Sequence, residues 1–144
     1  SESQEFSDRS QSLFPGFSGD NTRNFVTTMY IGFLDRLADS SGLTYFEAVF
    51  NTAYANGGIE GARAEAIEFG KTVLNSAEYQ SKNPTNGTHV LSFYRAYLGR
   101  FPGESEFNYW VRELDAGRET VVSVITTFAN SSEFSHKLNS YFVP

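Results

Sequence analysis

Residues 88–134 decide the fold and read THVLSFYRAYLGRFPGESEFNYWVRELDAGRETVVSVITTFANSSEF. An imperfect copy precedes them. The motif Tyr-x-x-x-Leu-x-Arg ends at Arg36 and at Arg100, an aromatic pair begins at Tyr45 and at Tyr109, and Asn-Ser-x-Glu ends at Glu78 and at Glu133. The first two pieces are offset by 64 residues and the third by 55, so the first copy carries an insertion around residues 51–61. The sequence therefore predicts two tandem copies of one unit.

Apolar residues in the first copy recur every three to four positions, which is the period of an amphipathic helix. The first helix is predicted to begin at Asn21 or Thr22 and to turn its apolar stripe inward as far as Leu37. The remaining helices of this copy are predicted to begin at a Ser40 or Ser41 cap and end at Asn56-Gly57-Gly58, to span roughly residues 60–74, and to begin at a Ser76 cap.

The second copy repeats this order. Its helices are predicted to begin at the caps Thr88, Ser105, Thr120 and Ser131 or Ser132, and the first of them to turn its apolar residues inward as far as Phe101. We therefore predict an all-α fold in which two tandem repeats of about four helices share one core as an irregular, orthogonal bundle. Repeat one spans 21–83 and repeat two 86–142, within a single domain 21–144. Residues 1–20 are predicted to be a flexible tail or linker.

Composition excludes several classes of function. The formal charge is −6 and the pI is about 4.9, and Lys and Arg are scattered, so a nucleic-acid partner is not expected. The absence of Cys excludes disulfides and Cys-ligated metals. No apolar run approaches the roughly 18 residues of a membrane span, so membrane insertion is not expected. The chain begins at Ser1 rather than Met, which indicates a mature product or an excised piece.

The repeated motifs resemble a bacterial family known as domain of unknown function 4214. The family pattern is roughly Tyr-x-x-x-Leu-Gly-Arg, then Asp-x-x-Gly-Leu-x-Tyr-Trp, then Asn-Ser-x-Glu-Phe/Tyr, and both copies carry it between residues 22 and 138. The departures are Asp35 for the family's Gly and Glu106-Phe107 for its Gly-Leu. The arrangement is also distantly similar to the helical linker domain of phycobilisome linker polypeptides. These resemblances imply an accessory or binding module, often exported or on the cell surface, and name no reaction.

The recurrent charges are Arg36 with Glu78 and Arg100 with Glu133. Each Arg ends the first helix of its unit, and each Glu lies in the first turn of the last helix. We expect each pair to form a bidentate ion pair, because the guanidinium fork matches a carboxylate. The alternatives are solvated surface charges or a ligand site.

Other polar groups suggest no chemistry. His89 and His136 have no partner at catalytic spacing and are expected to be surface residues. Asp35 and Asp39 raise the question of a calcium site, but the loop lacks the ligand density of an EF-hand, and Gly99 and Gly103 replace both residues in the second copy. We therefore expect no cofactor, no metal site and no catalytic residue.

Most aromatic residues lie on apolar stripes and are expected in the core. Tyr45 and Tyr109 each precede an inward-facing ring, Phe46 or Trp110, and are the pair expected at the surface as a binding site. The sequence predicts a non-enzymatic interaction or scaffolding module of an exported or cell-surface bacterial protein, with a protein or a surface polymer as its partner. The alternatives are a carbohydrate-binding module that uses the exposed aromatics, and an enzyme's accessory domain with a cryptic site.

Overall fold

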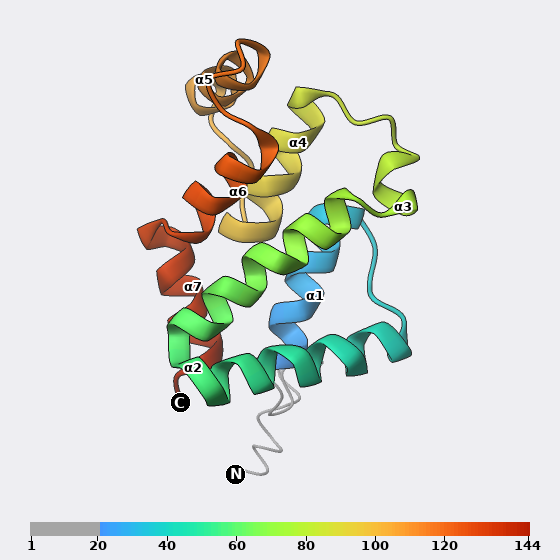
Figure 1. Ribbon diagram of the computed structural model, residues 1–144, viewed down its shortest axis with the longest axis vertical. Coiled ribbons are helices and arrows are strands. Elements are labelled where there is room, and N and C mark those ends of the chain that lie inside the picture. Colours follow the sequence, from blue (N-terminus) through green and yellow to red (C-terminus); the bar gives the residue numbers. More distant parts are fainter. Residues whose placement is uncertain (1–20) are drawn as a thin grey trace.

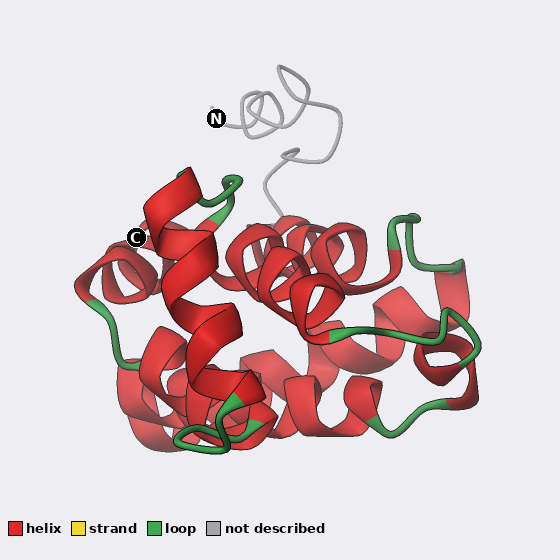
Figure 2. Ribbon diagram, turned by 90° about the horizontal axis from the view of Figure 1, so that it is seen from above, coloured by secondary structure: helices red, strands yellow, loops and turns green. Residues whose placement is uncertain are grey.

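The computed structural model describes residues 21–144, which form helices and loops without a strand (Figure 2). The all-α class is therefore confirmed for these residues, and the predicted tail 1–20 lies outside them. The elements are α1 (Asn21–Leu34), α2 (Ser40–Leu74), α3 (Ala77–Gln80), α4 (Asn86–Phe93), the π-helix η2 (Tyr94–Leu98), α5 (Glu104–Asp115), α6 (Val121–Ala129) and α7 (Ser132–Phe142). Residues 121–128 are helical, as their apolar spacing predicts.

Helix α1 lies at the centre of the bundle and packs against α2, α3, α4, η2 and α7 (Figure 1). Its apolar stripe is fully enclosed: Phe25, Val26, Met29 and Phe33 expose no surface. Every other helix except α5 adds buried apolar side chains to the same cluster, and α5 packs partly buried residues against it. One continuous core therefore holds residues of both predicted repeats.

Helix α2 consists of two limbs that meet at Gly58, whose φ of 65° and ψ of −151° are not helical. Figure 1 shows the first limb crossing one end of α1 and the second running back along the bundle. The sequence predicted a helix end at Asn56-Gly57-Gly58 and a new helix from about residue 60. The kink lies in the predicted insertion, and a glycine permits it because the left-handed half of φ space is open to it.

Three predicted helix starts are wrong by one to three residues. Asp39, not Ser40 or Ser41, caps α2 and accepts the Gly42 N–H at 2.7 Å. Thr85, not Thr88, caps α4, and Gly103, not Ser105, precedes α5. Each start lies in a run of polar residues with several possible caps, and the cap is the residue whose backbone is still extended. The caps predicted at Ser76, Thr120 and Ser131 are confirmed.

The prediction that Leu37 and Phe101 point inward is wrong, because each is 67% exposed. The preceding helices end at Leu34 and Leu98, one turn earlier than the apolar spacing suggested. Asp35 and Gly99 cause these ends, because their φ values of 58° and 67° are left-handed and terminate a right-handed helix. Asp35 stands where the family pattern has Gly, and it adopts the backbone conformation for which Gly is the usual residue.

Candidate functional site

Arg36 and Arg100 both form bidentate ion pairs with the glutamates expected from the sequence. The Arg36 guanidinium donates to the two Glu78 carboxylate oxygens at 2.7 and 2.8 Å. Arg100 donates to both Glu133 oxygens at 3.0 Å, and also to both Glu106 oxygens at 3.0 Å. Each pair joins the loop after one helix to the first turn of another. We call these two ion-pair sites, Arg36–Glu78 and Arg100–Glu106–Glu133, the clasps.

The clasps hold the glutamates in the ionised form. The hydrogen bond from Arg36 lowers the pKa of Glu78, and the bond from Arg100 lowers the pKa of Glu133. Arg100 and then the Gly103 N–H lower the pKa of Glu106 to about 2. Between 37% and 49% of each of these side chains is exposed, and ion pairs this accessible to solvent contribute only about 0–1 kcal/mol to stability each. The clasps therefore position the chain more than they stabilise it.

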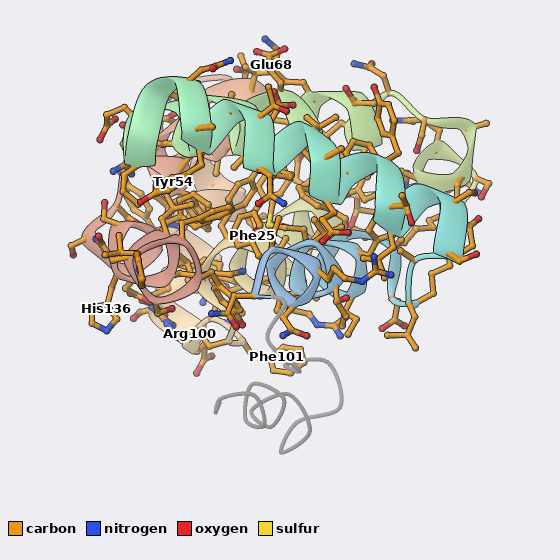
Figure 3. All side chains as sticks on the ribbon, turned by 90° about the horizontal axis from the view of Figure 1, so that it is seen from below. Phe25, Tyr54, Glu68, Arg100, Phe101 and His136 are labelled. Atoms are coloured by element: carbon orange, nitrogen blue, oxygen red, sulfur yellow. The ribbon has the colours of Figure 1, made fainter. Side chains whose placement is uncertain are left out.

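Each clasp also fixes the backbone of the exposed apolar residue that follows it. Arg36 Nη1 donates to the Leu37 carbonyl at 2.9 Å, and Arg100 Nη1 donates to the Phe101 carbonyl at 3.3 Å. We call Leu37 and Phe101 the clasp anchors. The Arg95 guanidinium lies 5.4 Å from the centroid of the Phe101 ring. In Figure 3, Arg100 and Phe101 lie on the side of the molecule opposite the first limb of α2.

Tyr45 and Tyr109 are 62% and 46% exposed. Each contacts the ring that follows it edge to face, with centroids 4.9 Å apart for Tyr45 and Phe46 and 5.0 Å apart for Tyr109 and Trp110. Tyr45 lines an open groove of about 380 Å³ between the limbs of α2, together with Ala48, Val49, Thr52, Ala53 and Glu65. The structure therefore does not bring the two tyrosines into one site.

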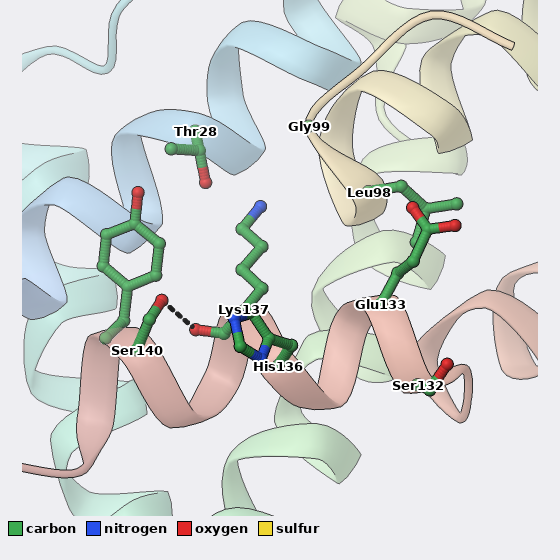
Figure 4. Close-up of a pocket in the computed structure, with 9 residues that line it drawn as sticks. Thr28, Leu98, Gly99, Ser132, Glu133, His136, Lys137 and Ser140 are labelled. Carbon is green, nitrogen blue, oxygen red and sulfur yellow. Dashed lines mark hydrogen bonds between the residues drawn. The ribbon is translucent and has the colours of Figure 1, made fainter.

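A larger open groove of about 760 Å³ lies along α7, and the sequence analysis missed it. Its lining comes from α1, the end of η2 and α7: Thr28, Leu98, Gly99, Ser132, Glu133, His136, Lys137, Ser140 and Tyr141. We call it the α7 groove. Lys137 points from α7 between α1 and the end of η2 (Figure 4). The available sequence signal was the recurrence of Lys at 82 and 137, which carries the same 55-residue offset as Glu78 and Glu133.

The Lys137 side chain is half-buried, and its ammonium group is the buried part. The ammonium donates to the Ala96 carbonyl at 2.7 Å and lies 5.3 Å from the Phe25 ring centroid and 6.0 Å from that of Phe134. No carboxylate of residues 21–144 forms an ion pair with it. Burial therefore lowers the pKa of Lys137 to about 7.

This lowered pKa predicts that the free energy of unfolding rises with pH above 7. Between pH 7 and 10.5 the folded Lys137 loses its proton while the unfolded chain keeps it, so the unfolded state binds more protons. Below pH 7 the folded state bears the full cost of burying the charged ammonium. As the pH rises above 7 this cost disappears, and the free energy of unfolding increases by at most about 1.4 kcal/mol per pH unit. Urea unfolding between pH 6.5 and 9.5 measures it.

The matched control for this measurement is Lys82, which donates to the Phe33 carbonyl at 3.0 Å but is exposed. Lys137→Met should remove most of the rise, and Lys82→Met should leave it unchanged. Equal pH slopes for the two variants would contradict the assignment to Lys137.

The two histidines lie in different environments. His136 is exposed on the rim of the α7 groove. His89 is not a surface residue, contrary to expectation: it stacks between Tyr79 and Phe93, and its Nδ1 lies 2.9 Å from the Tyr79 hydroxyl. Burial lowers the pKa of His89 and so favours the neutral imidazole. The signal for His89 was its place four residues before the apolar Phe93, which puts both rings on one face of the helix.

The aspartates considered for calcium have structural partners. Asp35 Oδ1 lies 3.3 Å from the Arg95 guanidinium nitrogens. Asp39 Oδ1 accepts from the Gly42 N–H and from the Ser41 hydroxyl, which lowers its pKa. Within residues 21–144, no three His, Cys, Asp or Glu side chains are grouped so that they could hold a metal ion.

Of the helices between residues 21 and 144, none is both long and apolar enough to cross a bilayer. No curated protein and no solved structure matches the chain. The model of a family described as a domain of unknown function (DUF4214) matches residues 70–138 as one copy, from the second limb of α2 to α7. The match includes the Arg100 clasp, Phe101 and Lys137, and the second copy expected at the N-terminal end stays a prediction.

Proposed function

We propose that the chain is a non-enzymatic helical interaction and scaffolding module of an exported or cell-surface bacterial protein. The observation that carries the proposal is the pairing of each clasp with an exposed apolar anchor. At both Leu37 and Phe101, the arginine that forms the ion pair also donates to the carbonyl of the anchor residue. The large side chain is thus exposed on a backbone that is already held in place.

Preorganisation of the backbone at an anchor favours binding. Association costs free energy for each side chain and loop that becomes ordered, and a segment ordered beforehand avoids part of that cost. In many interfaces a few side chains that enter well-packed, desolvated pockets of the partner supply most of the binding energy. The Arg100 guanidinium is engaged by two carboxylates, which suits a positioning role better than a chemical one.

The exported location and the scaffolding role are supported by the sequence rather than by the packing. The chain has no Cys and a net charge of −6, and its motifs resemble a family whose members look like parts of larger exported proteins. The distant similarity to phycobilisome linker domains favours scaffolding. The duplication of one helical unit belongs to this proposal, because the clasp arginines and their anchors recur at an offset of 64 residues, and Glu78 and Lys82 recur as Glu133 and Lys137 at an offset of 55.

A carbohydrate-binding module is the second candidate. The observation that favours it is the groove beside Tyr45, where an exposed ring borders apolar surface from Ala48 and Val49. Such a ring can stack on the apolar face of a sugar.

The test measures binding of the labelled chain to envelope fractions of the producing bacterium. We expect saturable binding that protease treatment of the envelope abolishes. Leu37→Ser combined with Phe101→Ser should weaken it at least tenfold, and Val122→Ser, at a 41% exposed site, should not. Binding that survives in the double anchor variant would overturn the proposal. Binding lost only in Tyr45→Ala, and only after glycans are stripped, would favour the carbohydrate alternative.

A further inference from the structure

We propose that the α7 groove binds an acidic sugar residue whose carboxylate is held by the Lys137 ammonium. This ligand site uses other residues than the clasp anchors. It therefore does not rest on the proposed interaction function, and either proposal can fail without the other.

The Lys137 ammonium is the first part of the argument. An ammonium has three N–H donors, and one is used on the Ala96 carbonyl. Burial of a charge without a counter-ion costs several kcal/mol, and a bound anion recovers part of that cost. Around the ammonium, residues 21–144 supply one carbonyl and the rings of Phe25 and Phe134, but no counter-ion.

Lys82 shows that a lysine can donate to a carbonyl near the end of a helix without being buried. It donates to the Phe33 carbonyl near the end of α1, as Lys137 does to the Ala96 carbonyl near the end of η2, and its ammonium lies 4.9 Å from the Tyr79 ring centroid. Lys82 is exposed and lines none of the grooves described above. The combination of a buried ammonium and a place in the lining of an open groove is thus particular to Lys137.

The hydroxyl groups around Lys137 favour a ligand that carries its own hydrogen-bond donors. The Thr28 hydroxyl donates to the Phe25 carbonyl at 2.7 Å, and the Ser140 hydroxyl donates to the Lys137 carbonyl at 2.9 Å (Figure 4). Their hydrogens are therefore engaged, and their lone pairs are left to accept hydrogen bonds from a ligand. A ligand that carries several hydroxyls beside one carboxylate fits this set. The Tyr141 ring and Leu98 add apolar surface.

Neighbouring charges are compatible with an anion in the groove. Glu133 is the one carboxylate in the lining, and both of its oxygens accept from Arg100, a guanidinium that it shares with Glu106, so a charge of −1 remains at this clasp beside the Lys137 ammonium. The other ionisable groups in the lining, apart from Lys137 itself, are His136 and Tyr141. The residues from α1 and from the end of η2 are Thr28, Leu98 and Gly99, which carry no charge. Because the whole chain carries a charge of −6, the attraction is local, and the groove suits one acidic residue rather than a dense polyanion.

The experiment titrates the purified chain with sodium galacturonate at pH 6.5 and follows amide and lysine side-chain NMR signals. Galactose is the neutral control, and acetyl-Gly-Glu-Gly-amide is the acidic peptide control. Lys137→Met removes the charge and keeps a similar shape, and Lys82→Met is the matched variant.

We expect galacturonate to shift the NMR signals of Thr28, His136 and Ser140. The chain should bind galacturonate at least tenfold more tightly than galactose or the peptide. Lys137→Met should lower the affinity for galacturonate tenfold, and Lys82→Met should not. Saturating galacturonate should also raise the pKa of Lys137 in the unaltered chain, a readout that holds even if Lys137→Met fails to fold. Equal binding by Lys137→Met, an unmoved Lys137 pKa, or peptide binding as tight as that of galacturonate would overturn the proposal.

Discussion

Phe25→Ala is expected to lower the free energy of unfolding by about 3–5 kcal/mol, the range for removing a fully buried phenylalanine ring. Phe25 exposes no surface and has four other rings around it, with centroids 5.1 to 6.2 Å away: Phe50, Phe134, Tyr141 and Phe142. These rings come from α2 and α7, so the cavity would lie where both meet α1. Chemical denaturation measures the loss.

The control for this substitution is Phe101→Ala. The same side chain is removed, but Phe101 is 67% exposed, so its loss should change stability by no more than about 0.5 kcal/mol. A similar loss of stability in both variants would mean that the core does not centre on α1.

Gly32→Ala is expected to cost about 3 kcal/mol or more, at the upper end of the range for overpacking. A Cβ atom added at Gly32 would overlap the backbone of Ala96, where α1 crosses η2. Backbone atoms cannot rotate away as a side chain can, so the two helices would have to separate. Thermal unfolding and near-UV circular dichroism report this change.

Gly57→Ala is the matched control, because a Cβ atom at Gly57 meets no atom within 4 Å. This substitution should be neutral or stabilising by up to about 1 kcal/mol, since alanine is the better helix former. If Gly32→Ala were as stable as Gly57→Ala, the close approach of α1 and η2 would be wrong.

The fold class and the ion pairs could be predicted because they depend on local, repeated signals. The apolar period of three to four residues identified α1, α6 and α7, and the repeated Arg and Glu positions indicated which charges meet. Helix ends were less predictable. The stripe of α1 was extended to Leu37 because an apolar residue at the expected spacing looks the same whether the helix continues or a left-handed Asp35 has ended it.

The α7 groove could not be predicted, because it depends on three segments that are far apart in the sequence. Thr28, Gly99 and Lys137 meet only after α1, η2 and α7 have packed. The exposure of Lys82 and the burial of Lys137 also follow from packing, although each lysine lies four residues after a clasp glutamate. The π-helix at Tyr94–Leu98 likewise has no signature in the apolar period, which continues through it.

The most direct test of the clasps leaves the anchors intact and weakens only their support. Arg36→Lys combined with Arg100→Lys keeps both charges but loses the fork that holds the glutamate and the anchor carbonyl together. Its affinity for the bacterial envelope is the measurement. We predict at least a tenfold loss of affinity with a change in unfolding free energy of no more than about 1–2 kcal/mol for the two exposed sites. Unchanged affinity in this double variant would contradict the claim that the clasps prepare Leu37 and Phe101 for binding.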